Sequence, residues 1–95
     1  MKIYMHWDME GVSGIFARQQ VWFWEDGVSP EVAQDGRELL IADVNAATRA
    51  ALDAGADQVI VCDTHHGGDN VLQNGEVVDV AYLGRDFEPA QKSVW

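Results

Sequence analysis

Two carboxylates follow the first apolar stretch of the chain. Asp8 and Glu10 stand two residues apart in MHWDMEGVSG, directly after KIYMHW. Side chains at i and i+2 point to the same side where the backbone is extended, and Gly11 and Gly14 allow the chain to turn tightly behind them. Alone, the pair is compatible with a turn cap, a solvated loop, a magnesium site or a zinc site.

A second polar cluster follows another apolar run. QVIVC leads into Asp63-Thr64-His65-His66. Carboxylates and imidazoles together are ligands of zinc, manganese or iron. Three to four such ligands at one edge indicate a two-metal hydrolytic site. A third histidine, His6, alternates with apolar residues inside the first run, so we interpret it as structural.

Whether the two polar clusters lie close together depends on the strands and the helix that connect them. Residues 2–7 and 58–62 are predicted strands, and the β-branched run Val59-Ile60-Val61 is typical of a buried one. A helix over residues 29–54 separates them. Strand, helix and strand make a βαβ unit with parallel strands, and ligands gather at the carboxyl ends of such strands. The predicted fold class is α/β with a mainly parallel sheet, both faces covered, and a third strand over residues 76–83.

The helix has a clear start and stop. Ser29, Pro30 and Glu31 form a cap, a first-turn proline and an early acid. Gly55 is the natural end. Gly36 weakens the first turns, so we expect the ordered helix to begin after it. An apolar stripe faces the core: Leu40, Val44, Ala47 and Ala51.

The secondary structure of one aromatic run cannot be predicted from its periodicity. Val21-Trp22-Phe23-Trp24 is too short for a helix or strand prediction. It is either a lid packed on the core or an interface patch, and core packing is the favoured interpretation.

The composition of the chain limits the classes of partner and the cellular location that we expect. The 95 residues carry a formal net charge of −10, which argues against nucleic acid and anionic membrane surfaces as partners. A single cysteine, Cys62, excludes an internal disulfide. Asp8 interrupts any signal-peptide core, and no window approaches the roughly 20 apolar residues of a membrane span. We expect a soluble, cytoplasmic protein of one domain, residues 1–95.

The quoted segments resemble a known family. MKIYMHWDMEGVSG is similar to the amino terminus of the D-aminopeptidases of the DppA type, peptidase family M55, and the resemblance continues through DGRELLIADVNAATRAALDAGADQVIVCDTHHGGDN. The family implies two zinc ions, removal of N-terminal D-amino acids from short peptides, and a homo-oligomeric ring of ten subunits. By resemblance Asp8 bridges the two ions, Glu10 binds one, and His65 binds the other. Asp63 is expected to orient an imidazole or hold the turn.

The resemblance also implies that groups are missing. The family has a further histidine and glutamate as zinc ligands, and a histidine nucleophile, all beyond the matched region. The chain is therefore expected to be the N-terminal portion of a larger three-layer domain, with an incomplete catalytic set and no turnover alone.

Three functions remain open at this point. The first is the zinc aminopeptidase. The second is a magnesium-dependent phosphotransferase with Asp8 as aspartyl nucleophile, which leaves the histidines without a role. The third is a non-catalytic fragment that packs on a partner through Trp22, Phe23 and Trp24. Zinc prefers imidazole and magnesium does not, so the histidines favour the first.

Overall fold

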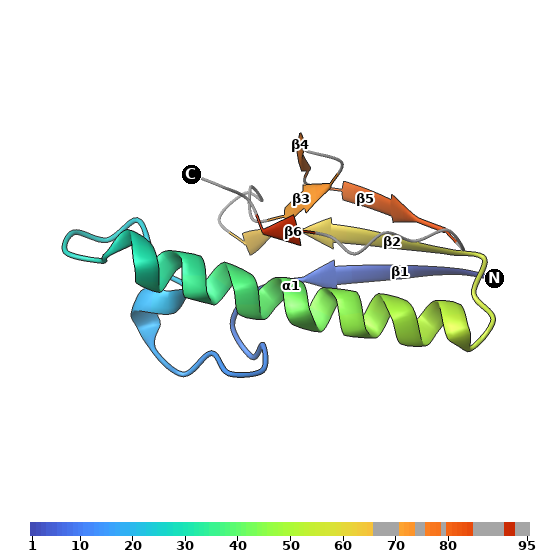
Figure 1. Ribbon diagram of the computed structural model, residues 1–95, viewed down its shortest axis with the longest axis horizontal. Helices are drawn as coiled ribbons and strands as arrows, with labels where there is room; N and C mark the ends of the chain where they lie inside the picture. Colours follow the sequence, from blue (N-terminus) through green and yellow to red (C-terminus); the bar gives the residue numbers. More distant parts are fainter. Residues whose placement is uncertain (66–70, 74–75, 79, 85–90, 93–95) are drawn as a thin grey trace.

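The fold is a βαβ unit extended by short strands (Figure 1). The computed structural model describes residues 1–65, 71–73, 76–78, 80–84 and 91–92. Strand β1 (Lys2–Trp7), helix α1 (Pro30–Asp53) and strand β2 (Gln58–Asp63) follow one another, with a short 3₁₀ helix, η1 (Arg18–Gln20), before α1. β1 and β2 pair in parallel, so the predicted α/β class and βαβ unit are confirmed.

The remaining strands are antiparallel to their neighbours. β5 (Val80–Leu83) completes a sheet of order β1-β2-β5, and β3 (Val71–Gln73) lies between β4 (Glu76–Val78) and β6 (Gln91–Lys92) in a second sheet. The single strand predicted over residues 76–83 is therefore wrong: β4 and β5 belong to different sheets, and residue 79 lies outside the described residues. β5 starts at the edge where β2 ends, since Val80 pairs with Cys62. The described residues between the two strands include no crossover helix, and a strand that returns without one is antiparallel.

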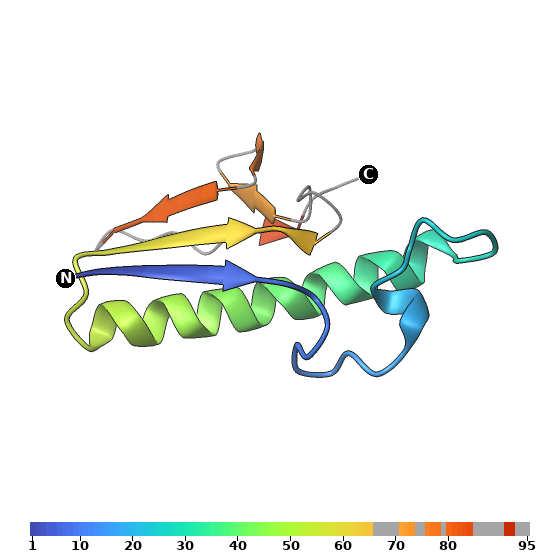
Figure 2. The ribbon, with the colours of Figure 1, turned by 180° about the vertical axis from the view of Figure 1, so that it is seen from behind.

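The core lies between α1 and one face of the first sheet (Figures 1 and 2). Val59 and Val61 of β2 pack there with Leu40 and Val44 of α1, all at most 2% exposed. The alternating burial of β2 shows which face is covered. On the other face Tyr4 is 62% exposed. The expectation that both faces are covered does not hold within the described residues, because α1 covers only one.

Helix α1 starts and ends where the sequence predicts. The Ser29 hydroxyl accepts a hydrogen bond from Val32 N, Pro30 occupies the first turn, and Gly55 follows with a φ of +110°. The expectation that order begins only after Gly36 is wrong, since the helix runs through it. No helix in the described part of the chain is long and apolar enough to cross a membrane.

Gly36 is explained by packing and not by helix weakness. A Cβ atom at this position would lie 2.1 Å from the main-chain oxygen of Gln20 and 3.2 Å from Met9 Cε. Only glycine permits η1 to approach the helix this closely. The residue that lowers helix propensity is thus the one that lets the segment before α1 dock.

The aromatic run alternates between core and surface. Val21 and Phe23 are buried, whereas Trp22 and Trp24 are exposed and stack on each other at 5.6 Å between ring centroids. The buried Arg37 guanidinium lies 4.5 Å from the Phe23 ring centroid. The core interpretation holds for two of the four side chains.

Candidate metal centre

The pairing of β1 with β2 brings the two polar clusters to one edge. Trp7 pairs with Asp63, so the next residues leave the sheet together, and Thr64 N donates to Trp7 O at 3.2 Å. Asp8 follows one strand end and His65 the other. The parallel register thus converts a separation of 57 positions into direct contact.

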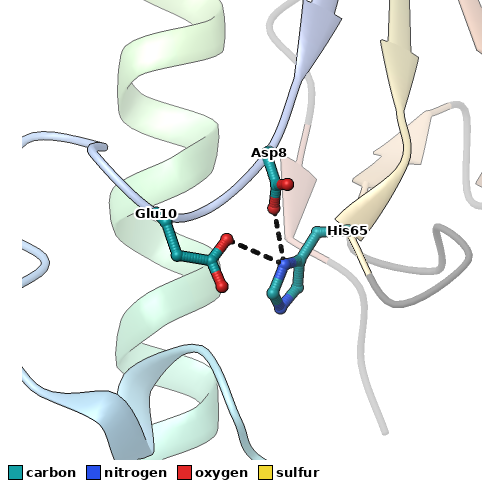
Figure 3. A group of neighbouring side chains, drawn as sticks. All are labelled: Asp8, Glu10 and His65. Carbon is teal, nitrogen blue, oxygen red and sulfur yellow. Dashed lines mark hydrogen bonds and ion pairs between the residues drawn. The ribbon is translucent and has the colours of Figure 1, made fainter.

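Asp8, Glu10 and His65 converge at this edge (Figure 3). His65 Nδ1 lies 2.7 Å from Asp8 Oδ1 and 3.3 Å from Glu10 Oε2. Their candidate ligand atoms all lie within 4.8 Å of one another, so the three side chains could hold a metal ion. The structure therefore brings together all three residues that the sequence singled out as metal ligands.

The other two histidines, His6 and His66, are not part of this cluster of three. His6 Nε2 is hydrogen-bonded to Thr64 Oγ1 at 2.7 Å, outside the cluster of three. His6 is exposed and lines the cavity beside the carboxylates, so the structural role expected for it stays a prediction. His66 lies outside the described residues.

A buried methionine explains why the two carboxylates point outward. Met9, between them, is fully buried in the core, while Asp8 and Glu10 are more than half exposed. Val12 N donates to Met9 O, which closes a turn, and Gly11 takes a φ of +94°. This positive φ, which side chains disfavour, confirms the turn predicted there.

The imidazole of His65 is fixed at both ends. The side chain is 5% exposed, and Nε2 lies 2.7 Å from Val21 O. A carbonyl oxygen can only accept, so Nε2 carries a proton and donates it. An ionised carboxylate also only accepts, so Nδ1 is the donor in the 2.7 Å contact with Asp8 Oδ1, and this proton must leave before Nδ1 can bind a metal. Asp63 Oδ1 accepts from His65 N at 3.2 Å, which holds the turn as expected. The role of Val21 was missed because a main-chain oxygen has no residue-type signal in a sequence.

Electrostatics favour a cation here. The pKa of Asp8 is lowered, chiefly by hydrogen bonding with the Glu10 side chain; burial opposes this as the second-largest effect, and His65 and the Met9 N–H group lower the pKa further. Asp8 is therefore ionised at neutral pH. A carboxylate kept in its charged form beside the imidazole is a suitable metal ligand.

An open cavity of about 240 Å³ adjoins the carboxylates. Asp8 and Glu10 contribute to its wall. The remaining lining residues are His6, Trp7, Gly11, Val12 and Asp43. Solvent and small molecules can therefore reach the carboxylate side of the cluster.

The donor set fits a transition metal. One imidazole nitrogen and two carboxylates suit zinc, manganese or iron, whereas magnesium prefers oxygen alone. The second nitrogen of His65 donates to a carbonyl, as metal-bound histidines usually do.

One of three comparisons with known proteins finds a match for the chain. No curated protein and no solved structure matches the chain. A family model does match: Peptidase_M55, described as D-aminopeptidase, aligns with residues 1–80. Because this match covers most of the chain and includes both polar clusters, the protein belongs to the Peptidase_M55 family of D-aminopeptidases.

Proposed function

We propose that this protein works as a zinc-dependent aminopeptidase that releases N-terminal D-amino acids from short peptides, with Asp8, Glu10 and His65 as zinc ligands. The observation that carries the proposal is the convergence of one imidazole nitrogen and two carboxylates at one strand edge, in a chain of the D-aminopeptidase family. A zinc ion held there would act as a Lewis acid toward the scissile carbonyl.

The chain's own groups have distinct parts in this proposal. His65 presents Nδ1, because Nε2 is engaged with Val21 O. Asp8 uses one oxygen, Oδ1, for both His65 and Met9 N. No dashed line joins its second oxygen to His65 in Figure 3, which leaves that oxygen for the bridging role between two zinc ions that the family resemblance implies.

Three ligands are few for two ions, since zinc usually takes four. We therefore expect turnover to depend on groups beyond Asp8, Glu10 and His65. Assembly into a homo-oligomer, a ring of ten by family resemblance, is also part of the proposal. The phosphotransferase alternative leaves the imidazole of His65, which lies 2.7 Å from Asp8 Oδ1, without a role.

Metal content tests the ligand assignment. We expect protein purified without added metal to retain zinc, His65→Ala to lose it, and His6→Ala to keep it. The control is matched, since both histidines lie near the ends of β1 and β2, but His65 contacts Asp8 and Glu10 while His6 is hydrogen-bonded to Thr64. Zinc retained in full by His65→Ala, or magnesium as the sole bound metal, would contradict the proposal.

Substrate class needs a second measurement. The zinc-loaded protein is titrated with D-alanyl and L-alanyl dipeptides while the NMR signals of His65 are followed. We expect shifts at lower concentrations of the D isomer. Equal responses to both isomers would reject the D-specific assignment while leaving the metal site intact.

A further inference from the structure

The imidazole of His65 is positioned from the side opposite the metal ligands. Nε2 donates to Val21 O at 2.7 Å, and both partners are at least 95% buried. The orientation of Nδ1 toward Asp8 and Glu10 therefore depends on where Val21 O lies. Val21 belongs to the loop after η1, far from β2 in the sequence, so something must hold this loop in place.

Gln20, the residue before Val21, has the contacts to do so. Its side chain is buried, at 3% exposure. Oε1 accepts from Phe16 N and Ala17 N, both at 2.8 Å. Nε2 donates to Asp35 Oδ2 of α1 at 3.0 Å. One buried amide thus ties the incoming loop to itself and to the helix.

The main chain of Gln20 is fixed as well. Its oxygen lies against Gly36, where a Cβ atom would come within 2.1 Å. Val21 N donates to Arg18 O at 3.1 Å, and the Val21 side chain is 4% exposed. Val21 O, which accepts the hydrogen bond from His65, is therefore held in place by Gln20, through both the side chain and the main chain of that residue.

We propose that Gln20 is a positioning residue of the metal centre: its buried amide fixes Val21 O, and Val21 O holds His65 with Nδ1 toward Asp8 and Glu10. This inference rests on the proposed function for its consequence, namely metal affinity. Partners that orient a metal-bound histidine typically change metal affinity about 10- to 100-fold when removed.

The test compares Gln20→Met with Gln19→Met. Methionine keeps the volume of the glutamine side chain and removes its hydrogen bonds, while Gln19 is an exposed neighbour in the same 3₁₀ helix. Zinc affinity is measured by calorimetry. The Hε2 proton of His65 is observed by ¹H–¹⁵N NMR in metal-free protein. We expect Gln20→Met to bind zinc about 10- to 100-fold more weakly and to lose the protected Hε2 signal, and Gln19→Met to do neither.

A double variant provides the rescue. Gln20→Glu with Asp35→Asn reverses the direction of the hydrogen bond between these two side chains, because the new carboxylate accepts where the amide donated. It gives up the longer bond from Gln20 Nε2 to Gly14 O, at 3.5 Å. It retains an acceptor for Phe16 N and Ala17 N. We expect this variant to recover both zinc affinity and the Hε2 signal.

Each outcome is decisive. A folded Gln20→Met variant with unchanged zinc affinity and Hε2 signal would overturn the proposal, as would an unprotected Hε2 in the unchanged chain. If Gln20→Met does not fold, the double variant decides: folded protein without the Hε2 signal overturns the proposal, and a recovered signal supports it. Failure of the unchanged chain to bind zinc would instead reject the proposed function, since the Hε2 signal is measured without metal.

Discussion

Replacing Gly36 by alanine separates helix propensity from tertiary packing. In an exposed helix this change stabilises by about 1 kcal/mol, because alanine is the better helix former. Here the new methyl group would lie 2.1 Å from Gln20 O, while ordinary contact begins at 3.4 Å. The segment must retreat by about 1.3 Å, the difference between these distances.

The cost of that retreat outweighs the gain. Overpacking a tight contact costs about 1–3 kcal/mol and sometimes more, and the obstructing atom is main chain, which cannot rotate away. We expect Gly36→Ala to lower the free energy of unfolding by about 2 kcal/mol, which lowers the melting temperature by roughly 10 °C for a domain of this size. A retreat of this size also moves Val21 O, so zinc affinity falls in parallel.

The assay is urea unfolding followed by circular dichroism. Ala46→Gly, the reverse change at an exposed position of α1, is the control and should lower the free energy of unfolding by about 1 kcal/mol. If Gly36→Ala instead raised it by about 1 kcal/mol, the segment would not be docked on the helix and the reasoning would be refuted.

Three further outcomes are expected. Thr48 is fully buried, and among the described residues its hydroxyl has no hydrogen-bond partner. Thr48→Val should therefore raise the free energy of unfolding by about 1 kcal/mol. The control is Thr64→Val, which removes a hydroxyl bonded to Trp7 O and should lower the free energy of unfolding. Met9 is fully buried, so Met9→Ala should lower the free energy of unfolding by about 2–5 kcal/mol in the same urea assay. Met9→Leu nearly keeps the volume and should lower the free energy of unfolding by less than about 1.5 kcal/mol. The lowered pKa of Asp8 means that its ionised form stabilises the metal-free fold above the ordinary value of 3.8, and that this stabilisation is lost as the pH falls through the lower folded-state value. Asp8→Asn should therefore flatten the rise in stability with pH below the ordinary value of 3.8, measured by unfolding at each pH; an unchanged slope would contradict this.

Features that depend only on residues adjacent in the sequence could be predicted from the sequence. Ser29 and Pro30 start α1 because a cap and a first-turn proline act within one turn. The β-branched run of β2 favours a strand through its own side-chain sterics. Residue type, together with the rule that parallel strands end at one edge, indicates Asp8, Glu10 and the cluster from Asp63 to His66 as candidate ligands. The choice of His65 within that cluster is what the resemblance to the D-aminopeptidases implies.

Other features exist only because distant segments touch. Local helix propensity predicts a weak point at Gly36, but the glycine is required by the main-chain oxygen of Gln20, 16 positions earlier in the sequence. β4 and β5 were predicted as one strand, since local pattern cannot show which sheet a segment joins.

The orientation of His65 was decided by tertiary structure alone. It depends on Val21 O, a group that every residue has, placed by the docking of η1 against α1. The sequence by itself determined which side chains could bind a metal, because that is a property of their chemistry. Only the folded chain decided which nitrogen faces the carboxylates, because this depends on a hydrogen bond between residues 44 positions apart.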